Sequence, residues 1–125
     1  MIVADASAIL ATLLDEPGGE QLRNLGQPFV LSTVTHCEVA AVLTSKGFRG
    51  DEVREIVEPF RTKCRPLTPA QALQAGLWRA EARAKGLSLG DRCCLALEKD
   101  IGATVLTGDR AWAGLDLGVT IRLVR

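Results

Sequence analysis

Four acidic residues lie near the starts of predicted helices, and their side chains have the chemistry to bind a metal ion together. They are Asp5, Glu38, Asp91 and Asp109. Carboxylate oxygens with no set of His or Cys ligands beside them favour Mg²⁺ or Mn²⁺ over zinc. Ions held in this way promote phosphodiester hydrolysis, because they activate water and stabilise the leaving oxygen. The four acids therefore predict a metal-dependent hydrolytic site, provided that the fold brings them together.

Each acid also has a simpler role available at the start of a helix. The spacings Thr35-x-x-Glu38 and Ser88-x-x-Asp91 both match the capping box, in which an acid bonds back to the backbone of the first turn. The other two acids occupy positions suited to an N-cap, a contact that stabilises a protein by about 1 kcal/mol. Capping accounts for any one acid, so the case for a shared site depends on where the four lie in space.

Short apolar strands alternate with longer helical segments along the chain. Strands are expected at residues 2–4, 29–31, 104–106 and 119–124. Helices are expected at 7–14, 19–25, 34–45, 51–63, 69–85 and 90–99, with a helical turn around Trp112. This order predicts an α/β fold with a mainly parallel sheet covered by helices on both faces.

A sheet of this kind would gather the acids at one edge. Ligands of parallel α/β sheets bind at the carboxyl ends of the strands. Asp5 and Asp109 each follow a predicted strand, and they meet at that edge if their strands are neighbours. Glu38 and Asp91 lie near the starts of helices that begin at the same edge. Like charges about 4 Å apart repel by roughly 1 to 4 kcal/mol, so such a cluster requires a cation.

The composition is that of a globular protein with no overall charge. The chain has 125 residues, enough for one domain with a sizeable core, and 47% of them are hydrophobic. It has no apolar run long enough for a transmembrane helix and no signal-peptide pattern, so we expect a cytoplasmic protein without a membrane partner. Fifteen basic residues balance fifteen acidic ones, which argues against a non-specific nucleic-acid binder with a basic overall field.

The cysteines and the single histidine do not form a zinc-binding pattern. The four cysteines are Cys37, Cys64, Cys93 and Cys94, and none of them belongs to a CxxC motif. His36 has no partner at zinc-ligand spacing. In a cytoplasmic protein we expect the cysteines to be reduced, and the adjacent pair Cys93 and Cys94 to be small core residues.

Four segments of the chain resemble the successive motifs of PIN-domain ribonucleases, in particular the toxins of VapBC toxin–antitoxin pairs. The segments are MIVADASAIL, THCEVA, LSLGDRCCLALE and TVLTGDRAW. The resemblance extends from end to end, so residues 1–125 are expected to form a single PIN domain. Carried over by position, it makes Asp5, Glu38, Asp91 and Asp109 the catalytic, metal-binding acids, and the sequence departs from the family pattern at none of them.

The resemblance also implies a fold, an activity and partners. The fold is a Rossmann-like α/β/α sandwich with a central, mainly parallel sheet. The activity is that of an endoribonuclease dependent on Mg²⁺ or Mn²⁺, which leaves 5′-phosphate and 3′-hydroxyl ends on a substrate such as transfer or ribosomal RNA. The partners are a small cognate antitoxin, whose C-terminal segment docks into or beside the acidic groove, and a second copy of the chain in a homodimer.

Four polar residues beside the acids have supporting roles to consider. Ser7 and Thr107 could hold a metal-bound water or a carboxylate in place, or could cap a helix or turn. Arg92 and Arg110 each follow an acid directly. They could contact a substrate phosphate or an antitoxin carboxylate, or could be ordinary solvated or ion-paired surface arginines.

Two other classes of function remain open. A phosphatase of the haloacid-dehalogenase-like kind expects Asp-x-Asp after the first strand, whereas this chain has Asp5-Ala6-Ser7. That class and receiver-like phosphoryl-transfer domains both expect a late lysine, and no lysine follows Lys99. A non-catalytic module that binds RNA or protein on the same fold is the second alternative. Loss of one of the four acids would favour it, and none is missing.

Overall fold

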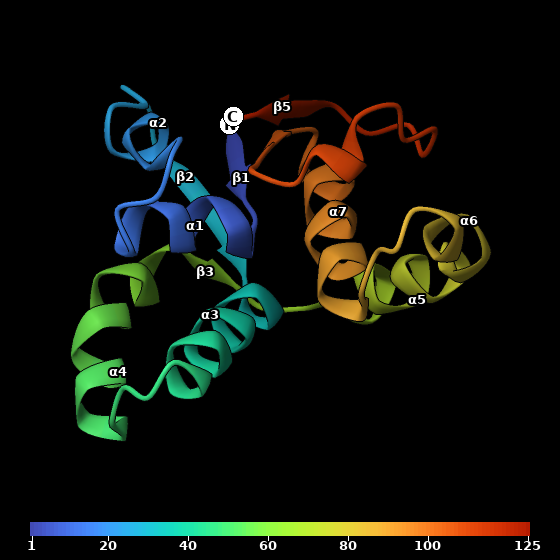
Figure 1. Cartoon of the computed structure of the whole chain (residues 1–125). Helices are drawn as coiled ribbons and strands as arrows, with labels where there is room; N and C mark the ends of the chain where they lie inside the picture. The colour runs from blue at the N-terminus through green and yellow to red at the C-terminus, as the bar shows by residue number, and fades with distance from the viewer.

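Five parallel strands form the central sheet of the computed structural model, which describes residues 1–125 (Figure 1). The strands are β1 (Ile2–Ala4), β2 (Phe29–Ser32), β3 (Cys64–Arg65), β4 (Thr104–Thr107) and β5 (Ile121–Leu123). Their order across the sheet is β3-β2-β1-β4-β5, and every neighbouring pair is parallel. The predicted α/β class with a parallel sheet is therefore confirmed.

The two central strands place the ends of β1 and β4 level with each other. Their register pairs Val3 with Val105 and Ala4 with Leu106, and the backbone N–H of Asp5 continues the ladder by donating to the Leu106 carbonyl (3.1 Å). From β1 the chain moves to β2 on one side and later crosses to β4 on the other side. A parallel sheet leaves a crevice at such a reversal of strand order, outside the carboxyl ends of the strands.

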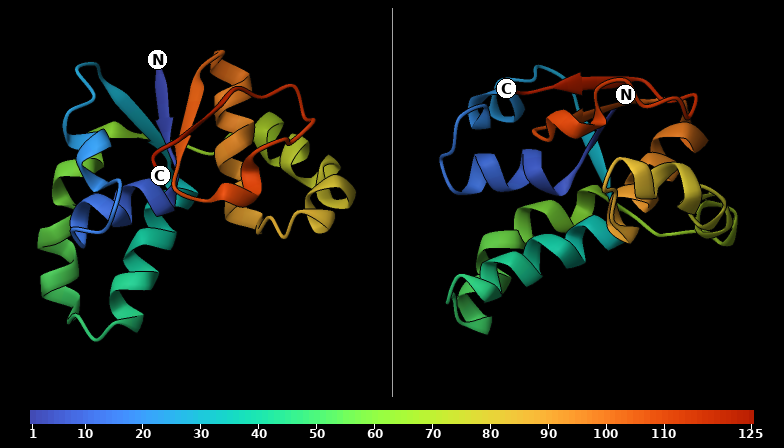
Figure 2. Two further views of the ribbon diagram at one scale, coloured as in Figure 1. Left: turned by 45° about the horizontal axis from the view of Figure 1, so that its top comes forward. Right: turned by 45° about the vertical axis from the view of Figure 1, so that its right-hand side comes forward.

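Helices cover both faces of the sheet. Helices α1 (Ala6–Leu13), α2 (Gly19–Arg23), α3 (Thr33–Ser45) and α4 (Gly50–Val57) lie on one side, and α5 (Pro69–Leu77), α6 (Arg79–Ala84) and α7 (Leu89–Ile101) lie on the other (Figures 1 and 2). Two 3₁₀ helices, η1 (Glu58–Lys63) and η2 (Arg110–Trp112), complete the chain. The α/β/α layering that the sequence predicts is therefore present.

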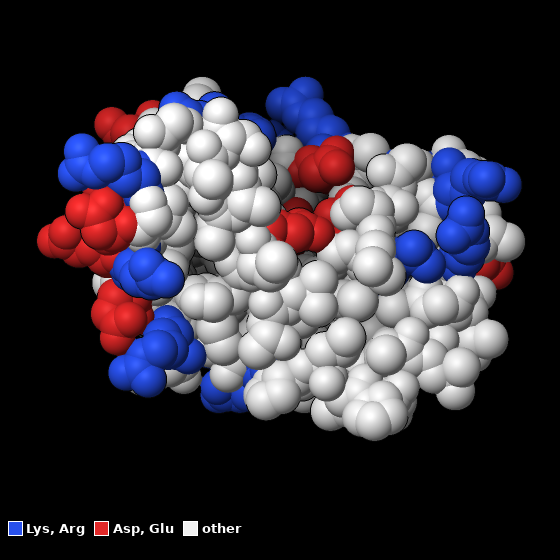
Figure 3. Space-filling view, turned by 90° about the horizontal axis from the view of Figure 1, so that it is seen from below, with Lys and Arg blue, Asp and Glu red and all other residues white.

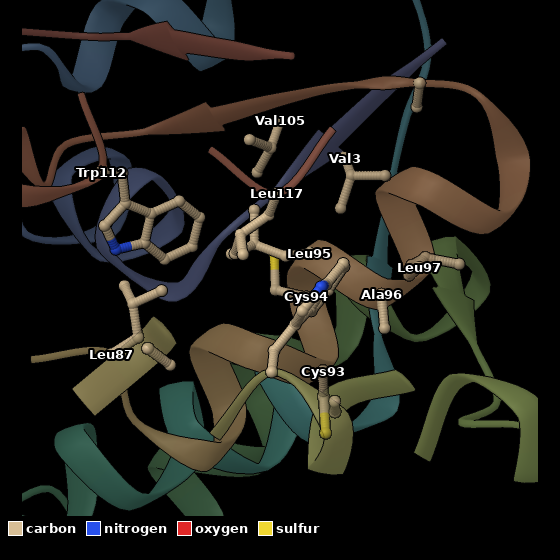
Figure 4. Packing of buried hydrophobic residues seen from close by; sticks show 14 of the residues in the cluster. Val3, Leu87, Cys93, Cys94, Leu95, Ala96, Leu97, Val105, Trp112 and Leu117 are labelled. Carbon is tan, nitrogen blue, oxygen red and sulfur yellow. The ribbon is translucent and has the colours of Figure 1, made fainter. Parts of the chain in front are cut away.

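Each face of the sheet has its own hydrophobic core. The core under α5, α6 and α7 contains Val3, Val105 and the fully buried Trp112, and Figure 4 shows Trp112 packed with Leu87 among its side chains. The core on the opposite face is formed by residues such as Ile2, Ala4 and Ile9 from β1 and α1, together with buried residues of β2, α3 and α4. Successive residues of β1 thus face opposite cores, as the alternation of a strand buried on both faces requires.

Two predicted helices are shorter than their apolar spacing indicated. The helix expected at 51–63 ends at Val57 and continues as the 3₁₀ helix η1, because Pro59 has no N–H for the α-helical ladder. The helix expected at 69–85 is divided at Trp78 into α5 and α6. Ala75, Trp78 and Ala82 are buried on either side of this break, so the spacing of apolar residues does not reveal it.

The cysteines are free, and Cys93 and Cys94 are buried, as expected. The two-residue strand β3 is absent from the predicted elements, since a segment that short has no alternating pattern to detect. None of the helices has the length and apolar character needed to span a membrane.

The close approach of α2 to α1 predicts a selective loss of stability. A Cβ on Gly19 would collide with the backbone of Ala11, which cannot move aside as a flexible side chain can. We expect Gly19→Ala to lower the free energy of unfolding by about 1–3 kcal/mol in a urea titration. Gly76 is the matched control, because it lies exposed in α5 with open space around its Cα. Gly76→Ala should stabilise the chain by about 0.5–1 kcal/mol, and equal losses for the two variants would contradict this account.

Candidate active site

Asp5 is a buried carboxylate at the end of the central strand β1. Its side chain is only 3% exposed, and it caps α1 by accepting a hydrogen bond from the backbone N–H of Ala8 (2.8 Å). The hydroxyls of Ser7 (2.8 Å) and Thr107 (2.5 Å) also donate to it. Asp5 is therefore both a helix cap and the centre of a polar network. Its role as an N-cap is compatible with a role in a shared acidic site.

The same two hydroxyls connect the loop after β4 to the start of α1. Ser7 Oγ accepts from the backbone N–H of Gly108 (2.8 Å), and Thr107 Oγ1 accepts from the backbone N–H of Asp109 (3.0 Å). Asp109 is exposed and caps η2 through a hydrogen bond from the Ala111 N–H to its Oδ1 (2.9 Å). The network thereby fixes the backbone of Asp109 relative to Asp5, although 104 positions separate them in the sequence.

Asp91 begins the third acidic segment and forms the predicted capping box. The Ser88 hydroxyl accepts from the Asp91 N–H (3.1 Å), and Asp91 Oδ2 accepts from the Ser88 N–H (2.9 Å). No hydrogen bond is made to Oδ1 of Asp91. One carboxylate oxygen thus positions the start of α7, and the other is available to a ligand.

The capping box predicted at Thr35-x-x-Glu38 is wrong. Helix α3 is capped by Ser32, whose hydroxyl accepts from the Val34 N–H (3.2 Å). Thr35 is buried inside the helix at 1% exposure. Glu38 therefore lies in the second turn of α3, where the backbone N–H groups are already paired within the helix, and its carboxylate has no capping role.

Gly90 makes room for the Glu38 carboxylate. A Cβ on Gly90 would occupy the position of Glu38 Oε1, so only glycine allows the start of α7 to lie against this side chain. The contact brings the second turn of α3 next to the residue that precedes Asp91. Sequence reasoning missed the role of Gly90. Its only signal was a glycine inside a predicted capping box, directly before an acid.

The four acids lie close enough for their charges to interact. Burial raises the pKa of Asp5 to about 6 against the lowering effect of its hydrogen bonds, and the charge on Asp91 raises it further. Burial raises the pKa of Glu38 to about 7, and the charges on Asp91 and Asp5 add to that increase. The pKa of Asp91 is also raised, first by burial and then by the charge on Asp109. The chain thus gathers carboxylates that resist being ionised together.

The chemistry of this group fits a hard divalent cation. All four candidate ligands are carboxylates, and burial raises the pKa of the nearby Cys94 thiol well above its usual value, which keeps the sulfur from acting as a thiolate ligand. As they stand, no three His, Cys, Asp or Glu side chains are arranged to hold a metal ion. Binding would therefore require the carboxylates to draw together around the ion.

The acidic group lies in a hollow on the face where the carboxyl ends of the strands emerge. In Figure 3 a group of Asp and Glu atoms occupies a recess near the middle of this face, surrounded mostly by uncharged atoms, while Lys and Arg atoms lie toward the periphery. Near the middle of this face, the recess is thus a local concentration of negative charge in a chain with no net charge. A cation would be attracted to that point of the surface.

The two candidate arginines differ in their surroundings. Arg92 is partly buried, and its Nη1 donates to the Ala75 carbonyl (2.9 Å), whereas its buried Nε has no partner. Arg110 is exposed in η2 and forms no ion pair. Arg92 is thus anchored beside the acids, while Arg110 is free to move.

The raised pKa of Asp5 predicts how stability depends on pH without metal. A carboxyl whose pKa is higher in the folded than in the unfolded chain stabilises the fold below the unfolded value of 3.8, and that contribution is lost as the pH rises through about 6. Each pKa unit corresponds to about 1.4 kcal/mol. In EDTA at pH 7.5 we expect Asp5→Asn to be more stable than the wild type by up to about 3 kcal/mol, with the gap closing near pH 4. Urea titrations across this range measure the difference, and a gap that does not change with pH would refute the assignment.

The comparisons with known proteins identify the fold family. The family model described as "PIN domain" matches residues 2–116. No curated protein sequence matches the chain. Among solved structures, DNA-bound VapBC from Salmonella typhimurium is 19% identical with a TM-score of 0.76, covering 99% of this chain and 98% of that chain. FitAcB from Neisseria gonorrhoeae is 20% identical with a TM-score of 0.72, again covering 99% and 98%.

A third similar structure is a toxin–antitoxin complex from Klebsiella pneumoniae, 14% identical with a TM-score of 0.75, which covers 100% of this chain and 98% of that chain. At these identities the structural likeness concerns the fold. The family model supplies the relationship, since it spans nearly the whole sequence, including all four acids. The chain, with its parallel sheet and the acids at the carboxyl edge of that sheet, therefore belongs to the PIN domain family.

Proposed function

We propose that this PIN domain is a metal-dependent endoribonuclease that hydrolyses phosphodiester bonds in RNA, with Asp5, Glu38, Asp91 and Asp109 as its catalytic, metal-binding acids. The observation that supports this most directly is the electrostatic coupling among the four carboxylates. Burial raises the pKa of Asp5, Glu38 and Asp91, and neighbouring carboxylate charges raise it further, so this group of acids favours a divalent cation, Mg²⁺ or Mn²⁺. When bound, such an ion supplies activation of water and neutralises charge on the phosphate.

In this proposal the four acids bind the metal ion, and the neighbouring hydroxyl residues keep one of the acids in position. Asp5 is fixed by its three donors and would serve as the rigid ligand, while the unpaired Oδ1 of Asp91 and the carboxylate of Glu38 would bind from two helices. Ser7 and Thr107 act as positioning residues, because they orient Asp5 without needing to touch the substrate. Asp109, the most exposed of the acids, completes the set at the rim.

We also propose that the chain is the toxin of a toxin–antitoxin pair and forms a homodimer. Similar structures are named as toxin–antitoxin complexes or as VapBC, and the sequence motifs resemble the same group. The partner would be a small protein encoded beside this chain, which blocks the acidic hollow. Structured RNA such as transfer or ribosomal RNA is the proposed substrate class. Light scattering of the purified protein with and without the co-expressed neighbour measures both assemblies.

A non-catalytic module that binds RNA or protein is the second candidate. It requires no cluster of coupled acids, and an acidic hollow repels RNA unless a cation intervenes. The coupling of four carboxylates therefore favours the nuclease over this alternative. An active metal-dependent preparation would exclude the non-catalytic module.

Metal binding should stabilise the protein. A cation that binds only the folded chain raises stability by about 2.7 kcal/mol when its concentration is 100 times Kd. We therefore expect Mn²⁺ or Mg²⁺ at 10 mM to raise the melting temperature by several degrees, and more at pH 8 than at pH 5.5 because the carboxylates must ionise to bind. Differential scanning fluorimetry with matched NaCl controls tests this. An unchanged melting temperature at pH 8 for both ions would be evidence against the site.

Removing one acid should abolish cleavage while the fold persists. Asp5→Asn and Asp91→Asn each delete a proposed metal ligand, and we expect a loss of at least 100-fold in the rate of RNA cleavage, as removal of groups acting on a transition-state charge produces. Asp116→Asn is the matched control, because Asp116 is exposed and makes no hydrogen bond or ion pair. Mapping new 5′ ends in total RNA, with and without EDTA, measures the activity. Cleavage by Asp5→Asn at the wild-type rate would overturn the proposal.

A further inference from the structure

A second hollow, lined by arginines, lies beside the acidic group. It has a volume of about 280 Å³. Its lining residues are Arg79, Arg83, Leu87, Ser88, Leu89 and Arg92. Three of the six carry a guanidinium, and none of the six is acidic. The first two arginines come from α6 and the third from the start of α7, so two helices supply the charges.

The three arginines have no carboxylate to neutralise them. Every ion pair in the structure involves other arginines. Glu81 is the one acid within α6, and it lies two residues from both Arg79 and Arg83, so it projects from a different side of that helix. Unpaired guanidinium groups around a recess are donors without an acceptor, which is the arrangement that phosphate or carboxylate groups complete.

Arg92 is held in place inside this hollow. Its Nη1 donates to the Ala75 carbonyl of α5 (2.9 Å), while its Nε is buried without an acceptor. The side chain is therefore anchored at one nitrogen and has donors to spare. An arginine that is fixed before binding loses less conformational freedom when an anion arrives than a mobile surface arginine does.

The first turn of α7 joins this hollow to the candidate metal site. Ser88 and Arg92 line the hollow, and the Ser88 N–H donates to Oδ2 of Asp91 (2.9 Å). Figure 3 shows basic atoms toward the right-hand side of this face, separated by uncharged atoms from the acidic recess at its middle. The first turn of α7 thus carries Asp91, which belongs to the acidic group, and Arg92, which lines the arginine hollow.

We propose that the hollow formed by Arg79, Arg83 and Arg92 binds a phosphate of the RNA strand next to the one that is cut. The proposal rests on the proposed nuclease function and names the side chains that hold its substrate. RNA is a polyanion that the acidic site repels, so its affinity must come from positive charge outside that site. These arginines supply three such charges in a hollow that shares the first turn of α7 with Asp91, and the exposed Leu89 adds an apolar surface for a ribose or base.

The test compares two double variants in an Asp5→Asn background, with EDTA present so that the probe stays intact. Arg79→Gln/Arg83→Gln removes the two exposed arginines of the hollow. Arg54→Gln/Arg122→Gln is the matched control, since both residues are exposed, form no ion pair and lie on α4 and β5. The probe is a fluorescein-labelled 12-nucleotide oligouridine, and fluorescence anisotropy gives Kd over a series of KCl concentrations. Circular dichroism verifies that both variants fold.

We expect the hollow variant to raise Kd at least tenfold and the control to change it less than twofold. The slope of log K against log[KCl] should fall by about 0.7 for each lost phosphate contact on a single strand. Equal effects of the two double variants would overturn the proposal, because they would show that RNA binding depends on the total positive charge of the chain and not on this hollow. So would a loss of binding to poly-L-glutamate with unchanged RNA affinity, which would assign the hollow to an acidic peptide.

Cleavage assays separate failure of this proposal from failure of the nuclease. In the chain with native Asp5 and added Mn²⁺, Arg79→Gln/Arg83→Gln should raise KM with little change in kcat, because the hollow binds a part of the strand that does not react. Metal-dependent cleavage with unchanged KM and Kd would overturn the arginine site and leave the nuclease intact. Weakened RNA binding in a chain that never cleaves would support the arginine site and refute the nuclease.

Discussion

The burial of one carboxylate, that of Asp5, at the end of the central strand is the constraint on which the site depends. Removing an ionised carboxylate from water is costly, and the hydrogen bonds from Ser7, Thr107 and the Ala8 backbone offset only part of that cost. The bond from Thr107 requires β1 and β4 to be neighbours in the register that sets Asp5 level with Thr107. The sheet order and the polar network therefore support each other.

If the four acids bind metal as we propose, this arrangement opposes activity and stability in the chain without metal. Two hydrophobic cores, one on each face of the sheet, hold β1 in position from both sides. They stabilise a strand end that the acids would otherwise destabilise, since Asp5, Glu38 and Asp91 all have raised pKa values. The proposed cation would relieve this repulsion, and raised pKa values of this kind are common among carboxylates at functional sites.

The sequence alone predicted the fold class, most of the helices and strands, and the Ser88–Asp91 capping box, because apolar period and capping chemistry are local signals. It placed Glu38 wrongly in a capping box, since the true cap, Ser32, lies where β2 passes directly into α3. The hollow lined by Arg79, Arg83 and Arg92 could not be predicted, because it depends on where α6 lies relative to the start of α7. The roles of the four acids stay predictions, derived from the sequence and supported by their proximity.

The contact between Glu38 and Gly90 lets α3 and α7 approach each other closely. It is possible because Gly90 has no Cβ methyl group to collide with the Glu38 carboxylate. Side chains at these two positions, 52 residues apart in the chain, thus compete for the same space. During divergence they are coupled: a larger residue at one is accommodated only by a shorter acid at the other. Homologues should therefore vary at this pair together, exchanging Gly with Glu for Ala with Asp, while the total space filled by the two side chains stays constant.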